Sequence, residues 1–147
     1  MHAVQIDDLE LIEGWSENDP ARRARFNFPI FNLTGALASS VVYFEVDPGQ
    51  HLGMHTDSAE EILYVVSGTA KAIVGDERGE LGPGSLALVP AMVPHDIVNA
   101  SDETVRVVGF FASATVVSVF DDPFAPSGRR VVGTPVPEES DVAALAI

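Results

Sequence analysis

The sequence contains no cysteine and only one lysine, Lys71. Without cysteine, the chain can form no disulfide bond and no thiolate metal site, and it has no cysteine nucleophile. A metal ion in this protein would therefore have to be held by nitrogen and oxygen atoms from His, Asp and Glu side chains.

Basic residues of both kinds are scarce, since eight Lys and Arg stand against 22 Asp and Glu, for a formal net charge of -14. Proteins bind nucleic acids and anionic lipids largely through clustered Lys and Arg, so we expect neither as a partner. No apolar run approaches the roughly 20 residues needed to cross a bilayer. The acidic N-terminal residues are also unlike a secretory signal. We therefore expect a cytoplasmic protein.

What the chain does have is the composition of an ordinary globular domain. It is 147 residues long, with 46% hydrophobic and 20% charged residues. This length fits one domain, residues 1–147, with enough apolar side chains for a core of its own.

Short apolar runs dominate the middle of the sequence and are rich in Val, Ile, Phe and Tyr. Gly, Pro, Asn and Asp separate them, which is the punctuation expected between β-strands. The runs cover residues 40–46, 61–67, 70–74, 85–90, 95–99, 104–111 and 114–120. They predict an all-β sandwich or barrel with a core at about 38–120. Residues 1–30 are expected to form an N-terminal arm with one short helix or edge strand, and residues 121–147 a C-terminal tail.

Histidines and carboxylates cluster around the start of the second run. Alternate side chains of a strand share a face, so His55 and Asp57 can line the same cavity. Glu61 continues this phase and begins an apolar run, where an inward carboxylate would be costly unless it were paired or bound to a cation. On alternation alone, Glu60 is an equally good choice for the inward residue.

The spacing of these residues forms two motifs. The first consists of Gly49, His55, Asp57, Glu61 and Gly68, and the second of Gly84, Pro90, His95 and Asn99. The pair resembles the two conserved motifs of the cupin superfamily, whose first motif supplies two histidines and a glutamate and whose second supplies a third histidine. The resemblance implies a small single-domain cupin with a double-stranded β-helix, or jelly-roll barrel. It also implies that His55, Glu61 and His95 are metal ligands.

Two positions depart from the cupin pattern. Asp57 stands where the second histidine is usual, and it is interpreted as a fourth ligand, a proton acceptor or a hydrogen-bond partner of a ligand histidine. Met92 replaces a usual glycine. Two imidazoles with one or two carboxylates suit one divalent ion, with Fe(II) or Mn(II) favoured over Zn(II) or Ni(II). A barrel that has lost its metal is the alternative.

The cupin resemblance allows several functions, because the same fold carries many activities. We expect an enzyme acting on a small organic molecule, with a non-haem metal oxygenase of the dioxygenase kind first and a metal-dependent isomerase or lyase next. In the latter, Asp57 or Glu61 would move the proton. The alternative is a non-catalytic cupin that binds or senses a small molecule.

Further residues are candidates for the substrate pocket. They are His51, Tyr64 and Met92, although Tyr64 also fits the core and His51 the surface. Small cupins commonly pair as dimers, and the apolar stretch at residues 26–33 offers an edge for such pairing, so we expect a homodimer.

Overall fold

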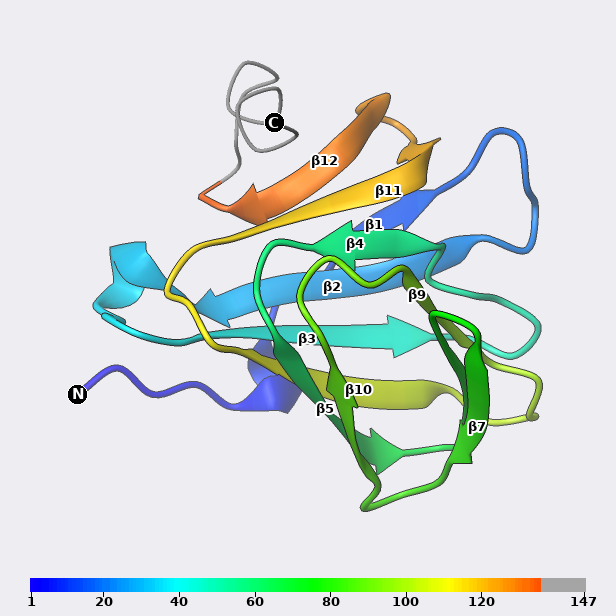
Figure 1. Cartoon of the computed structure of the whole chain (residues 1–147), viewed down its shortest axis with the longest axis horizontal. Helices are drawn as coiled ribbons and strands as arrows, with labels where there is room; N and C mark the ends of the chain where they lie inside the picture. Colours follow the sequence, from blue (N-terminus) through cyan, green and yellow to red (C-terminus); the bar gives the residue numbers. More distant parts are fainter. Residues whose placement is uncertain (136–147) are drawn as a thin grey trace.

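The computed structural model describes residues 1–135, which form β-strands and two short 3-10 helices, η1 and η2 (Figure 1). The N-terminal elements are η1 (Ile6–Asp8), β1 (Ile12–Trp15), β2 (Arg23–Ile30), η2 (Asn32–Thr34) and β3 (Ser40–Val46). The central strands are β4 (His55–Asp57), β5 (Glu61–Ser67), β6 (Ala70–Val74), β7 (Glu77–Leu81) and β8 (Leu86–Val89). The last strands are β9 (His95–Val98), β10 (Val105–Phe111), β11 (Val116–Phe124) and β12 (Arg129–Thr134).

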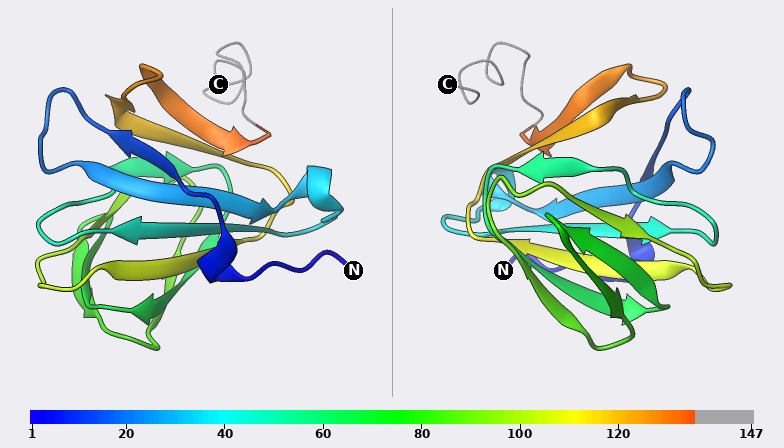
Figure 2. Two further views of the ribbon diagram at one scale, coloured as in Figure 1. Left: turned by 180° about the vertical axis from the view of Figure 1, so that it is seen from behind. Right: turned by 45° about the vertical axis from the view of Figure 1, so that its right-hand side comes forward.

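The strands form two antiparallel six-stranded sheets (Figure 2). Sheet A has the order β1-β2-β3-β10-β5-β8, and sheet B has the order β12-β11-β4-β9-β6-β7. Buried side chains of both sheets, including Phe44 and Leu63 from A and Ile97 and Phe120 from B, belong to one hydrophobic cluster. The two sheets therefore enclose a common core between them, as expected for the predicted jelly-roll barrel.

Strand β5 shows how the sequence builds this core. Glu61, Leu63 and Val65 are buried, whereas Ile62 and Tyr64 are exposed. Because the side chains of a strand alternate, the apolar odd-numbered residues fix which face meets the core. Glu61 is thereby carried inward together with Leu63.

All seven apolar runs of the sequence lie in strands, namely β3, β5, β6, β8, β9, β10 and β11. Strand β7 was not predicted, because its sequence, ERGEL, is exposed and has no apolar alternation. The N-terminal segment contains a short helix and an edge strand, η1 and β1, as expected.

The ends of the chain differ from the expectation in two respects. Residues 121–124 complete β11, and β12 pairs with it, so residues 121–134 belong to sheet B rather than to a tail. The remaining tail residues, 136–147, lie outside the described part of the chain. Residues 23–30, expected in an N-terminal arm, form β2, a strand of sheet A that pairs with β3 on one side and, from Arg23 to Phe26 only, with β1 on the other.

Within residues 1–135, no helix is both long and apolar enough to cross a membrane.

Candidate metal centre

Four buried polar side chains meet between the two sheets. His55 and Asp57 come from β4 and His95 from the adjacent β9, where His55 and His95 are direct cross-strand partners. Glu61 reaches them from β5 of the opposite sheet. None of the four is more than 5% exposed. Two separate sequence motifs thus form one site, because β4 and β9 are neighbours in sheet B and β5 faces them from sheet A.

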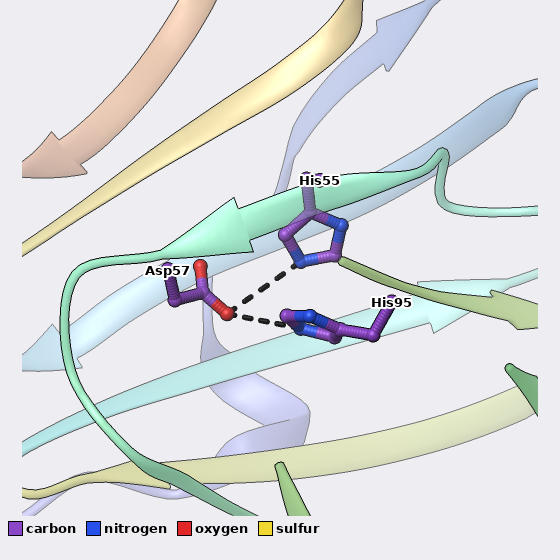
Figure 3. Close-up of side chains that lie close together, drawn as sticks. All are labelled: His55, Asp57 and His95. Carbon is purple, nitrogen blue, oxygen red and sulfur yellow. Dashed lines mark ion pairs between the residues drawn. The ribbon is translucent and has the colours of Figure 1, made fainter. Parts of the chain in front are cut away.

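The polar atoms of this site converge on one carboxylate oxygen (Figure 3). Oδ2 of Asp57 lies 3.0 Å from Nε2 of His95 and 3.7 Å from Nε2 of His55. Oε1 of Glu61 lies 3.5 Å from the same His95 nitrogen. His55, Asp57 and His95 each place one ligand atom within 4.8 Å of the others. This spacing is short enough for all three to contact one cation.

Hydrogen bonds outside this cluster set the orientation of each ligand atom. Nδ1 of His55 donates to the carbonyl of Gly53 at 2.7 Å, and Nδ1 of His95 donates to the carbonyl of Val93 at 2.9 Å. With Nδ1 protonated, each Nε2 presents a lone pair to the site, which is the arrangement typical of metal-binding histidines. The Ser118 hydroxyl donates to Oδ1 of Asp57, so that Oδ2 points toward the histidines.

Two atoms of the site have no hydrogen-bond partner although they are fully buried. They are Oδ2 of Asp57 and Nε2 of His95. Burying such atoms without partners is costly, and a divalent cation between them would satisfy both. Two carboxylates and two neutral imidazoles also carry a combined charge of about -2, which a divalent ion balances. The residues present therefore fit a bound metal ion.

The ionisation of the site reflects its burial and its two carboxylates. Burial raises the pKa of Glu61 to about 7 and lowers the pKa of His55. Burial also opposes a charge on His95, but the nearby carboxylates of Asp57 and Glu61 raise its pKa to about 10. The pKa of Asp57 is lowered, because contacts with the two histidines outweigh its burial. Protons therefore compete with a metal ion for these atoms.

Two further residues hold the cluster in place and were not identified from the sequence. A Cβ atom on Gly109 would lie 2.1 Å from Oε2 of Glu61, so β10 leaves room there for the glutamate. Phe120 stacks on the ring of His55, with the ring centroids 4.4 Å apart. The signal for Gly109 was a single glycine inside an otherwise β-branched and aromatic run, which often marks a close approach.

The three residues suggested for the substrate pocket do not line the cavity. His51 bonds instead to Asp19 and Asp96, with Nε2 and Nδ1 at 2.7 and 2.8 Å from their carboxylates. Tyr64 is 37% exposed on the outer face of β5, because the phase that buries Glu61 turns it outward. Met92 is 57% exposed and has a φ of 63°, a conformation that favours the glycine usual in the second motif.

Apolar side chains form the rest of the cavity wall. They are Phe26, Phe28, Val42, Phe44, Leu52, Leu63, Ile97, Phe111, Phe120, Phe124 and Val132. The cavity itself has a volume of about 40 Å³. Apart from the four candidate ligands, Ser118 supplies its only polar side chain among the described residues.

Comparison with known proteins agrees with this geometry. The family model described as "Cupin domain" matches residues 42–111, a range that contains both motifs and all four candidate ligands. Residues 42–111 thus form a cupin domain. This cupin is 29% identical over 112 residues to an uncharacterised protein of Streptomyces coelicolor, and the match covers 76% of this chain and 96% of that protein.

Solved structures share the fold of this cupin at low sequence identity. The polyketide cyclase RemF from Streptomyces resistomycificus is 23% identical with a TM-score of 0.62, covering 76% of this chain and 78% of that one. The oxalate decarboxylase of Lactobacillus farciminis is 22% identical with a TM-score of 0.67, covering 79% of this chain. This cupin spans only 34% of that enzyme. These similarities establish the fold, and the activities belong to the proteins named.

Proposed function

We propose that this cupin is a cytoplasmic enzyme that binds one divalent metal ion through His55, Asp57, Glu61 and His95. The observation that carries the proposal is the convergence of four buried donor groups with two unpartnered atoms, Oδ2 of Asp57 and Nε2 of His95. Burying such a cluster in an apolar barrel lowers the stability of the fold unless a cation or ligand pairs with its polar atoms.

The donor set favours Fe(II) or Mn(II), since two carboxylates and two imidazoles are harder donors than a three-histidine set. Zn(II) and Ni(II) are the next choices. The structural similarity to Bacillus subtilis oxalate decarboxylase, which has Mn(II) centres, is in keeping with this preference at 18% identity and a TM-score of 0.61. Asp57, which replaces the usual histidine, is proposed as a ligand because Oδ2 faces both imidazoles and Ser118 holds Oδ1.

The reaction we place first is oxidation of a small organic molecule by a non-haem metal oxygenase. A bound Fe(II) or Mn(II) would supply O2 activation in an oxygenase, or polarise a carbonyl in an isomerase or lyase. The apolar wall excludes water from the reacting molecule. An isomerase or lyase is the second candidate, with Asp57 or Glu61 moving the proton, because both carboxylates line the cavity.

Metal content tests the first part of this proposal. We expect elemental mass spectrometry to find close to one Fe or Mn per chain in protein purified without chelator or affinity-tag metal. The variants His95→Ala and Asp57→Asn should lose most of this metal, because each removes a group that faces the cation. Glu61→Gln should lose affinity as well, whereas the neighbouring exposed Glu60→Gln serves as the matched control and should keep it.

Metal absent from the native protein, and not taken up after anaerobic reconstitution with Fe(II) or Mn(II), would contradict the proposal. It would leave a metal-free cupin that binds or senses a small molecule. For a metal-loaded protein, consumption of O2 that depends on an added organic substrate distinguishes the oxygenase from the isomerase or lyase.

A further inference from the structure

A groove lies between the β1–β2 end of sheet A and strand β12 of sheet B. Ile12 of β1 and Asn27 of β2 line one side, and Gly133 and Thr134 of β12 line the other. These strands lie at the corresponding edges of the two sheets (Figure 2). The groove has a volume of about 310 Å³, and Leu33 of η2, which is 72% exposed, also lines it.

This groove borders the metal cavity at two phenylalanines. Phe26 and Phe28 line both spaces, and their rings form an edge-to-face pair with centroids 6.1 Å apart. From Phe26 the aromatic contacts continue through Phe124 and Phe120 to His55, with centroid separations of 6.0, 4.6 and 4.4 Å. Strand β12 runs along the same path, since Val132 lines the cavity and Thr134 the groove.

The inner cavity and the groove differ in size and polarity. The inner cavity, about 40 Å³, has room for only a few atoms beside the candidate ligands. The groove is much larger, and its described lining contains no charged side chain. Within residues 1–135, neither space has a Lys or Arg side chain in its wall to pair with a phosphate or a dicarboxylate.

We infer that the site takes an uncharged molecule with an apolar, ring-sized body and a small oxygen head group. The head enters the inner cavity, and the body lies in the groove against Phe26, Phe28 and Leu33. These three residues then determine specificity, because burying a ring against apolar walls is favourable while an ionic body would lose its hydration without a compensating partner. Only one part of this inference, the role of the head group, rests on the proposed function.

Two probes separate the roles of head and body. The first, 2,3-dihydroxynaphthalene, carries a head of two oxygens and a two-ring body, and catechol carries the same head with a smaller body. We expect calorimetric titration of the Mn(II)-loaded protein to give about tenfold tighter binding for the naphthalene compound. Oxalate and glucose 6-phosphate, which lack an apolar body, should bind more weakly than either.

A charge placed in the groove tests its location. Leu33→Asp should weaken the binding of 2,3-dihydroxynaphthalene about tenfold, because the carboxylate would lose hydration beside the ring. Leu37→Asp is the matched control, since Leu37 is 95% exposed and does not line the groove. Both positions are at the surface, so neither variant should unfold the protein, and both should retain the metal content of the native chain.

The inference would be overturned by equal affinities for catechol and 2,3-dihydroxynaphthalene, or by an unchanged affinity in Leu33→Asp. It would also be overturned if Leu33→Asp changed the mass of the protein in solution but not probe binding, since the groove would then hold a second copy. Binding of 2-naphthol to the metal-free protein tests the groove independently of the proposed function, because this probe can be titrated without a metal ion in the site. A protein that binds no metal but binds 2-naphthol in a Leu33-dependent manner disproves the metal site and retains the groove.

Discussion

At the scale of single residues, the most informative position is Asp57. A second histidine there would give the site three imidazoles and one carboxylate. With Asp57, the site has two imidazoles and two carboxylates. Oδ2 of Asp57 lies 3.0 Å from Nε2 of His95 and 3.7 Å from Nε2 of His55, and Asp57 is 2% exposed. A buried carboxylate in this position increases the need for a cation and favours harder metals.

Gly109 provides a test of the role of Glu61 that leaves all four donors in the sequence. Gly109→Ala should lower metal affinity at least tenfold, because its methyl group would occupy the position of Oε2 of Glu61 and also lie 2.8 Å from Cγ1 of Val42. The measurement is metal retention during dialysis against graded chelator concentrations.

Gly79→Ala is the matched control for this change. Gly79 lies in β7, and a Cβ atom there would meet nothing within 4 Å. If Gly109→Ala held its metal as tightly as Gly79→Ala does, Glu61 would not be required as a ligand.

At the scale of elements, His51 connects two parts of the chain that the sequence motifs do not relate. It lies between Asp19, in the β1–β2 connection, and Asp96 of β9. Hydrogen bonding to Asp96 raises the pKa of His51 to about 9, against an ordinary value of 6.5. The imidazolium thus holds the connection against sheet B.

This contact predicts a loss of stability at alkaline pH. The raised pKa means that the contribution of His51 is complete below about pH 6.5 and is lost as the pH rises through about 9. For a partly exposed group we expect about 1 to 2 kcal/mol. In urea unfolding with chelator present, the loss of stability between pH 6 and pH 10 should be smaller by this amount in His51→Gln than in the native protein.

His2→Gln is the control for the loss of a histidine, because His2 is exposed near the N-terminus. A pH dependence of unfolding that was the same in His51→Gln and His2→Gln would show that the ion pairs of His51 do not stabilise the fold.

At the scale of the whole molecule, the outer face of sheet A carries an apolar patch. It consists of Ile62, Tyr64, Leu86, Leu88 and Phe110, which are between 37% and 69% exposed. Cross-strand pairing makes the patch continuous, since Ile62 faces both Leu88 and Phe110, and Tyr64 faces Leu86. Strand β8 is the edge of sheet A, and among residues 1–135 no strand pairs with its outer side.

Beside residues 26–33, this patch is a second surface on which we expect a homodimer to form. Five half-exposed large side chains present on the order of 500 Å² per copy, so two copies would bury about 1,000 Å² at the lower end of specific interfaces. The patch contains no charged residue, so two copies of a chain with a net charge of -14 can approach there with less electrostatic repulsion. Pairing of two β8 edges would extend sheet A across both copies.

The double variant Leu86→Glu with Leu88→Glu should therefore be monomeric in sedimentation velocity at a concentration where the native protein is a dimer. Four carboxylates would face one another across the edge in such a dimer. Leu37→Glu is the control and should not change the mass. A native protein that sediments as a monomer at tens of micromolar, or a double variant that remains dimeric, would contradict this interface.

The sequence by itself predicted seven strands of the barrel and the candidate metal ligands. Runs rich in Val, Ile, Phe and Tyr mark β3, β5 and β10 as strands, and this local signal can be read without tertiary information. The spacing around His55, Glu61 and His95 was equally local within each motif. Strand β7 and strand β12 had no such signal, because one is exposed and the other follows a run rich in Pro and Gly.

Only the tertiary structure decided where these residues meet and what surrounds them. Alternation could not choose between Glu60 and Glu61, whereas packing of β5 against sheet B buries Glu61 and turns Tyr64 outward. The space beside Gly109 and the groove beyond Phe28 arise between strands that are distant in sequence. Contacts between sheets depend on register and on the way the strands pair, and a local pattern of residues contains neither.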